Sequence, residues 1–199
     1  MENRDHSVGS RIGMWLFLLS EILLFGGLFL LYAVYRSKHP ADFHAASLEL
    51  SRFDGTLNTA ILLTSSLTAV LAIFSLQSEN RPKRTMLFLA ATIAFGGAFL
   101  VVKAFEWTAK FEHGLYPGAA VLMAKPPGEI LYFGLYFTMT GLHALHVIIG
   151  MTILSVMLSF VRRGKATQER SAALENAGLY WHLVDIIWIF LFPLFYLIS

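Results

Sequence analysis

Long apolar stretches dominate the chain, and short polar segments separate them. Five of these stretches approach or exceed the roughly 20 helical residues that cross a hydrocarbon core about 30 Å thick. None of them alternates polar and apolar positions over about 10 residues, as the strands of a membrane barrel do. The pattern therefore predicts an all-α polytopic membrane protein, a single domain over residues 1–199 with five transmembrane helices at about 12–35, 56–78, 85–108, 130–161 and 176–199.

The third span has a short strongly apolar stretch, and the fourth span is unusually long. The third is strongly apolar only over 85–102, so we expect its helix to continue through Lys103, Glu106 and Trp107 to an interfacial end. There Lys103 and Glu106 are close enough to pair, and we expect an interfacial ion pair that contributes little to stability. The fourth span is too long for a perpendicular crossing, which predicts a tilt or a protruding end.

Composition supports an integral membrane protein and removes several kinds of chemistry. Hydrophobic residues make up 56% of the chain and charged residues 14%, whereas a soluble domain has about a quarter charged residues. The chain has no cysteine, which excludes disulfides, Cys-ligated metals, iron–sulfur clusters and a catalytic thiol. A net charge of +2 is too small to indicate a nucleic-acid partner.

Lys and Arg residues predict the orientation, because they concentrate on the cytoplasmic side of membrane proteins. Nine of the 15 lie in the N-terminal segment and in the second and fourth loops, in dense clusters, and the other six are spread through longer loops. This places the N-terminus inside and the C-terminus outside. The first span is not expected to be a signal peptide, since its leader is not clearly basic and a glutamate lies mid-span. The nine residues are Arg4, Arg11, Arg81, Lys83, Arg84, Arg162, Arg163, Lys165 and Arg170.

Glu21 is the only charged residue of the first span as drawn, and ionisable groups inside a membrane are costly. Without a cation beside it, such a carboxyl is expected to be neutral. One interpretation is a proton-relay or gating carboxyl. The interpretation that we favour is a neutral acid hydrogen-bonded to a neighbouring helix. Gly26-Gly27 nearby, and Gly96-Gly97 in the third span, predict close helix approach.

Three histidines and an aspartate lie in the last two spans, at depths compatible with one polar layer. His143 and His146 are three residues apart on one helix face, as are His182 and Asp185, with Trp181 on the face of Asp185. With Glu21, these residues resemble a ligand set for iron, manganese or zinc, and two of the histidines are able to ligate a haem. The interpretation that we favour is interhelical hydrogen bonding, including a His182–Asp185 pair.

Four segments in order resemble the subunit III family of haem–copper respiratory oxidases, the cytochrome c oxidase subunit 3 family. The last two segments are highly specific, and the resemblance covers nearly the whole chain. The segments are Ser20–Phe25 (SEILLF), Lys103–Trp107 (KAFEW), Thr140–Gly150 (TGLHALHVIIG) and Glu175–Leu191 (ENAGLYWHLVDIIWIFL).

The resemblance implies a non-catalytic subunit without haem or copper, in a bacterial plasma membrane. It would pack against oxidase subunits I and II, which hold those cofactors, in a complex that reduces oxygen to water and translocates protons. Bound phospholipid, support of proton uptake and protection against turnover inactivation are also implied. Glu21 matches the family's carbodiimide-reactive intramembrane carboxyl. Structural, lipid-contact or subunit-contact roles are implied for Glu106, His143, His146, Glu175, Trp181, His182 and Asp185.

One departure from the family pattern is visible. Longer members have seven helices, and the first span of this chain is expected to match their third, so the lipid-holding cleft beside the first two helices is not assumed. Subunit III of a quinol oxidase and the related subunit of a nitric oxide reductase remain alternatives. A His-liganded membrane metalloenzyme and a small proton-coupled transporter are alternatives from other classes.

Overall fold

The computed structural model describes residues 2–168 and 171–198, and regular structure in these residues is entirely helical. Five helices are long and apolar enough to cross a membrane, which confirms the predicted fold class. Two short helices, which the sequence had not indicated, lie in the longer connections. The long helices are α1 (Glu2–Lys38), α3 (Arg52–Gln77), α4 (Pro82–Glu112), α6 (Pro127–Arg162) and α7 (Ala172–Tyr196), and the short ones are α2 (Pro40–Ser47) and α5 (Ala120–Met123).

Local sequence signals explain where the helices begin and end. Pro82 and Pro127 occupy the first helical turns of α4 and α6, where the missing N–H costs nothing. The Ser51 side chain caps α3 by accepting a hydrogen bond from the backbone N–H of Asp54 at 3.3 Å. Beyond the C-terminal ends of α4 and α6, Gly114 and Gly164 both adopt φ of 67°, a conformation that favours glycine.

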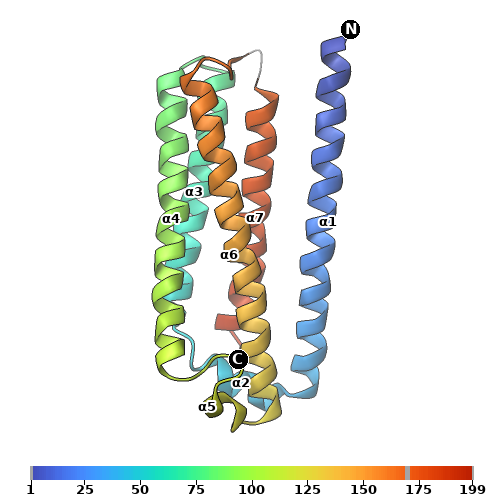
Figure 1. Cartoon of the computed structure of the whole chain (residues 1–199), viewed down its shortest axis with the longest axis vertical. Coiled ribbons are helices and arrows are strands. Elements are labelled where there is room, and N and C mark those ends of the chain that lie inside the picture. Colours follow the sequence, from blue (N-terminus) through green and yellow to red (C-terminus); the bar gives the residue numbers. More distant parts are fainter. Residues whose placement is uncertain (1, 169–170, 199) are drawn as a thin grey trace.

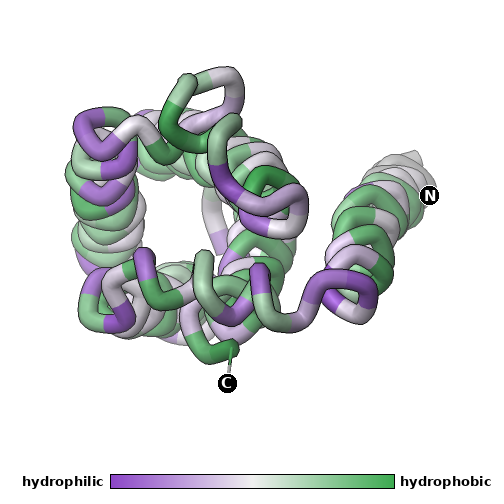
Figure 2. The backbone as a smooth tube through the Cα atoms, turned by 90° about the horizontal axis from the view of Figure 1, so that it is seen from below, coloured by the Kyte–Doolittle hydropathy of each residue, from purple (hydrophilic) through white to green (hydrophobic). Residues whose placement is uncertain are grey.

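Four of the long helices form a closed bundle, and the fifth stands at its side. Figure 2 shows α3, α4, α6 and α7 around one interior, with α3 and α4 joined as an antiparallel hairpin, whereas α1 lies outside. Helix α1 touches the bundle along α6 and α7. Only 11% of its most apolar window is buried, against 56% for α7, so α1 depends least on this chain for its packing.

The loops separate into two ends of the molecule. The N-terminus lies at the same end as the α3–α4 turn and the α6–α7 loop, while α2, α5 and the C-terminus lie at the other (Figure 1). This is the grouping of loops from which the orientation was predicted. Arg170, one of the residues in the basic clusters, and Ser199, the end of the fifth predicted span, lie outside the described residues.

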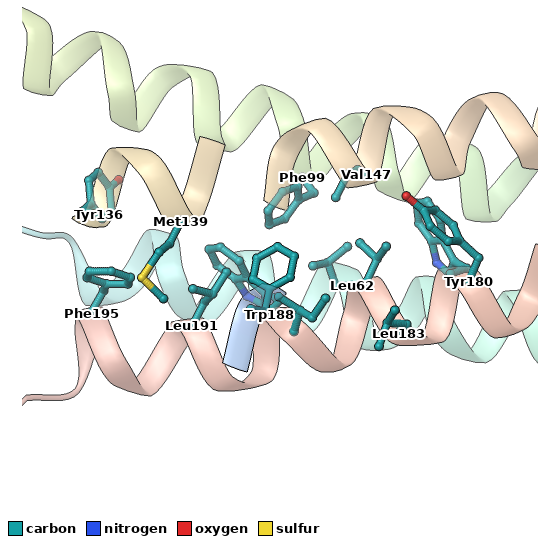
Figure 3. Close-up of a cluster of buried hydrophobic side chains, with 14 of the residues drawn as sticks. Leu62, Phe99, Tyr136, Met139, Val147, Tyr180, Leu183, Trp188, Leu191 and Phe195 are labelled. Atoms are coloured by element: carbon teal, nitrogen blue, oxygen red, sulfur yellow. The ribbon is translucent and has the colours of Figure 1, made fainter. Parts of the chain in front are cut away.

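Large aromatic side chains fill the bundle interior, and Figure 3 shows Trp188 and Phe99 pointing into it. Two glycines admit Trp181 to this core: a Cβ atom at Gly96 or at Gly150 would lie 2.8 Å from an atom of its ring. The expectation of close approach is thus confirmed at Gly96. It is wrong for Gly26-Gly27, which have no such neighbour within 4 Å because α1 stands off from the bundle.

Candidate functional site: buried polar groups in the helix bundle

Glu21 on α1 pairs with His146 on α6. Oε2 of the carboxyl lies 2.8 Å from Nε2 of the imidazole, and the two side chains are 13% and 9% exposed. The ring of Phe25 packs edge-on against His146, with 5.4 Å between the ring centroids, and shields one side of the pair. The pair ties α1 to the bundle, as expected for a carboxyl that joins helices.

The second nitrogen of His146 restricts where the proton of this pair sits. Nδ1 lies 2.7 Å from the backbone carbonyl oxygen of Leu142, which is only an acceptor, so Nδ1 must carry a hydrogen. A neutral His146 then has a lone pair on Nε2, and Glu21 must be protonated to donate to it. The only alternative with this geometry is an imidazolium–carboxylate pair, and both forms have no net charge.

His143 lies one turn away from His146 but does not join it. The side chain is fully buried, with its ring 5.4 Å from Phe99 and 5.3 Å from Trp188, measured between centroids. Neither ring nitrogen has a hydrogen-bond partner in the described part of the chain. The side chain packs here as an aromatic ring.

His182 and Asp185 do not form the expected pair. His182 Nδ1 lies 2.8 Å from Ser66 Oγ on α3, and neither carboxyl oxygen of Asp185 has a hydrogen-bond partner among the residues described. Trp181 is likewise bonded across the same helix contact, from Nε1 to Ser65 Oγ at 3.0 Å. The prediction was wrong because it considered only neighbours on one helix, and α3 supplied closer partners.

Lys103 and Glu106 are buried rather than exposed, which contradicts the expectation of a weak interfacial pair. Nζ lies 3.1 Å from Oε2, and the two side chains are 3% and 2% exposed. Nζ also donates to the hydroxyls of Tyr136 at 3.0 Å and Tyr196 at 2.6 Å, so all three of its N–H groups have partners. We call these four residues the Lys103 network.

The two tyrosines complete the carboxylate side of the Lys103 network. Tyr136 donates to Oε1 of Glu106 at 2.8 Å, and Tyr196 donates to the same oxygen at 2.6 Å. The network therefore joins α4, α6 and α7. Sequence reasoning missed both tyrosines, although a phenol in an apolar span generally needs a hydrogen-bond partner.

Glu175, another predicted contact position, lies near the start of α7. Its Oε1 accepts hydrogen bonds from Gln77 Nε2 at 2.5 Å and from Ser171 Oγ at 3.3 Å. These bonds join the end of α3 to the start of α7. The residue therefore acts as a tie between helices in the described structure.

The candidate residues form separate contacts instead of one polar layer. Of the five mid-membrane groups, the structure brings together only Glu21 and His146. In the described ranges, no group of three or more His, Asp and Glu side chains is arranged to hold a metal ion. The arrangement fits ties between helices: one from α1 to α6, three from α3 to α7, and one among α4, α6 and α7.

Comparisons with known proteins identify the family of this chain. The sequence model of the family described as cytochrome c oxidase subunit III matches residues 3–199. The chain is 37% identical over 190 residues to cytochrome c oxidase subunit 3 of Pelomedusa subrufa, covering 92% of this chain and 67% of the relative. It is 32% identical over 192 residues to the subunit 3 of Bacillus subtilis (strain 168), covering 94% and 86%. The protein of the same name from Thermostichus vulcanus is 32% identical over 190 residues, with 94% and 87% covered.

The fold defines a polytopic α-helical membrane protein in which several buried ionisable groups form hydrogen bonds between helices. The chain belongs to the cytochrome c oxidase subunit III family. This membership is consistent with a non-catalytic subunit of a terminal oxidase and implies a multi-subunit complex. In length, the chain matches the Bacillus and Thermostichus relatives better than the Pelomedusa one.

Proposed function

We propose that this chain is the non-catalytic subunit III of a cytochrome c oxidase that reduces oxygen to water and translocates protons. The observation that carries the proposal is the family match over residues 3–199, together with relatives that are all named cytochrome c oxidase subunit 3. The geometry supports it, since Glu21 and His146 bond to each other across helices, and Lys103 and Glu106 bond to tyrosines of α6 and α7.

In this proposal haem and copper lie in partner subunits, with subunit I as the catalytic partner and subunit II beside it. The engagement of His146 through both ring nitrogens supports this, because a metal would have to displace one of these bonds. Glu21 is the intramembrane carboxyl that supports the catalytic subunit and its proton uptake. Glu106, His143, His146, Glu175, Trp181, His182 and Asp185 hold the helices or contact lipid and partner subunits.

The proposed location is a bacterial plasma membrane, with the N-terminus inside and the C-terminus outside. The basic clusters of the α3–α4 turn and the α6–α7 loop support this orientation. Bound phospholipid is part of the proposal. A groove of about 210 Å³ lies between α1 and α7, and Phe25 and Phe190 are among its lining residues. The groove offers an apolar surface for an acyl chain.

Purification of the tagged chain from its native membrane in mild detergent tests the proposal. We expect a larger haem-containing complex to co-purify and to consume oxygen with reduced cytochrome c as donor. Oxygen consumption with quinol alone would contradict the cytochrome c assignment. Haem or metal remaining on this chain after the partners are removed, and lost in His146→Leu, would contradict the non-catalytic role.

A further inference from the structure

An outward-facing polar site lies halfway along α7, on the most buried of the five long helices. Six of the partly or fully exposed positions of α7 are spaced alternately by four and three, and Phe190, Phe192 and Leu194 beside them are also partly or fully exposed. This is the spacing with which one helix packs along another. The six residues, which we call the α7 seam, are Glu175, Leu179, His182, Ile186, Ile189 and Pro193.

Exposed side chains of α3 and a groove against α1 lie on the two sides of the α7 seam. On one side, Leu63 and Val70 of α3 are 51% and 47% exposed and flank Ser66. On the other side lies the apolar groove against α1, which Ile186 of the seam also lines. The α7 seam therefore lies between an exposed face of α3 and the groove against α1.

His182 is the polar side chain in the middle of the α7 seam. Its Nδ1 bonds to Ser66, and its Nε2 has no hydrogen bond in the described structure. If Ser66 donates to Nδ1, Nε2 carries a hydrogen and needs an acceptor; if Nδ1 donates to Ser66, Nε2 needs a donor. In both neutral tautomers Nε2 of this partly buried side chain is left without a partner among the described residues.

Asp185, one turn further along, is also short of a partner. It is 3% exposed, neither carboxyl oxygen is hydrogen-bonded in the part of the chain described, and the neighbouring Ser66 hydroxyl is already engaged with His182. If the Ser66 hydroxyl donates to Nδ1, it has no hydrogen left for the carboxyl; if Nδ1 donates to Ser66, the hydroxyl hydrogen remains for Asp185. In either case Nε2 of His182 has no partner within the described chain. The group of Ser66, His182 and Asp185 is therefore incomplete within this chain.

The depth of His182 in the membrane determines which kind of group can supply its missing hydrogen-bond partner. His182 is ten residues from the start of α7 at Ala172, about 15 Å along the axis, and about 20 Å from its end at Tyr196. At that depth acyl chains offer no hydrogen-bonding group, and lipid headgroups are too far away. An unsatisfied polar group in hydrocarbon costs several kcal/mol.

We propose that the α7 seam receives a transmembrane helix of another subunit of the oxidase, which presents a hydroxyl or amide side chain to His182 near the middle of the membrane. Such side chains bond across helices in membrane proteins. The proposal rests on the proposed function, because that function supplies the partner, and it adds the face of this chain that meets the partner and the side-chain chemistry that is recognised.

Site-directed photocrosslinking in the intact complex tests the docking face. A benzophenone amino acid replaces Ile189 in the seam or Leu63 beside it. Leu87 and Val101 on α4, which are 66% and 55% exposed, serve as matched lipid-facing controls. We expect crosslinks to another oxidase subunit from the seam positions only. Crosslinks to a second copy of this chain, to lipid alone, or equally from both sets of positions would overturn the proposal.

Substitution of His182 tests the polar contact. His182→Phe keeps a ring but removes the nitrogens, whereas His182→Gln keeps a donor and an acceptor. Since one such bond contributes about 0.6–1.7 kcal/mol, we expect the partner to dissociate roughly 3- to 20-fold more readily with Phe and Gln to restore most of the retention. Equal retention in both variants would overturn the polar contact.

Failure of the proposed function and failure of the docking face give different results. If the unaltered chain purifies without any haem protein, the proposed function is wrong. If it purifies with the oxidase but the crosslinks arise from α4, only the docking face is wrong. Helix content and thermal unfolding of each variant, compared with the unaltered complex, show whether a loss of partner reflects misfolding of this chain.

Discussion

The Nε2 atom of His146 lies 2.8 Å from Oε2 of Glu21, while its Nδ1 atom lies 2.7 Å from the carbonyl oxygen of Leu142. One side chain thus connects α1 to α6 and fixes its own tautomer through the preceding turn of its helix. A second side-chain hydrogen bond from α1 joins the hydroxyl of Tyr32 to the backbone carbonyl oxygen of Leu194 on α7. The Glu21–His146 pair is therefore one of the polar attachments of α1, the long helix least buried by this chain.

Substitution of Glu21 distinguishes attachment from proton transfer. Glu21→Gln is expected to leave assembly and turnover nearly intact, because the amide N–H can donate to Nε2 as a protonated carboxyl does. Glu21→Ala removes the bond and should lower the free energy of unfolding by about 0.6–1.7 kcal/mol. Thermal unfolding in detergent and sustained oxygen consumption measure the two properties. Slower sustained turnover in Glu21→Gln with unchanged subunit content would instead favour a role in proton movement.

Carbodiimide labelling reports the form of the same pair. A neutral acid donating to His146 should react with a hydrophobic carbodiimide in the intact complex, and Glu21→Gln should abolish the label. His146→Leu leaves the acid without a base in an apolar site, so it should label at least as well. Labelling found only in His146→Leu, and not in the unaltered protein, would show that the native pair is an imidazolium–carboxylate pair.

Hydropathy predicted the five spans, and with them which loops lie at the same end of the molecule, because length and apolarity are properties of local sequence. It could not predict the Lys103 network, in which Tyr136 and Tyr196 lie 30 and 90 positions from Glu106 along the chain. The same limit explains His182, whose spacing from Asp185 suggested a pair on one helix. Its partner, Ser66, is 116 positions away and is chosen by the packing of α3 on α7.

Removing one charge from the Lys103 network should be strongly destabilising. Lys103→Met leaves Glu106 buried without its cation, and Glu106→Gln leaves Lys103 without its anion, so each should lower the free energy of unfolding by about 3–5 kcal/mol. The double substitution Lys103→Met and Glu106→Leu should cost less than either change alone. Denaturant unfolding in detergent measures these values.

The matched control for that prediction is a pair on the surface. Arg84 and Glu79 are 3.3 Å apart with side chains 54% and 31% exposed, so Arg84→Met should cost only about 0–1 kcal/mol. An equally small loss in Lys103→Met would show that the network is solvated in the protein and not sealed by Tyr136 and Tyr196.

Adjacent glycines of α4 should respond in opposite directions to alanine. A Cβ atom at Gly96 would lie 2.8 Å from Cη2 of Trp181 and 3.1 Å from Cγ of Met151, whereas at Gly97 the nearest contact is an ordinary 3.8 Å to Cε of Met151. Ser65 holds the Trp181 ring through its Nε1 at 3.0 Å, so the ring has little freedom to move away. Gly96→Ala should therefore cost about 1–3 kcal/mol, the usual range for overpacking.

Gly97→Ala should instead be neutral or stabilise the helix by up to about 1 kcal/mol, because alanine has the higher helix propensity and finds ordinary space there. The two changes have the same intrinsic propensity term, so their difference isolates the contact with Trp181. Trp181→Phe replaces the ring with a smaller one. In that background, Gly96→Ala should lower the free energy of unfolding by less than it does in the unaltered protein. Equal unfolding free energies for the two alanine variants would mean that α4 and α7 do not approach as closely in the membrane as this packing requires.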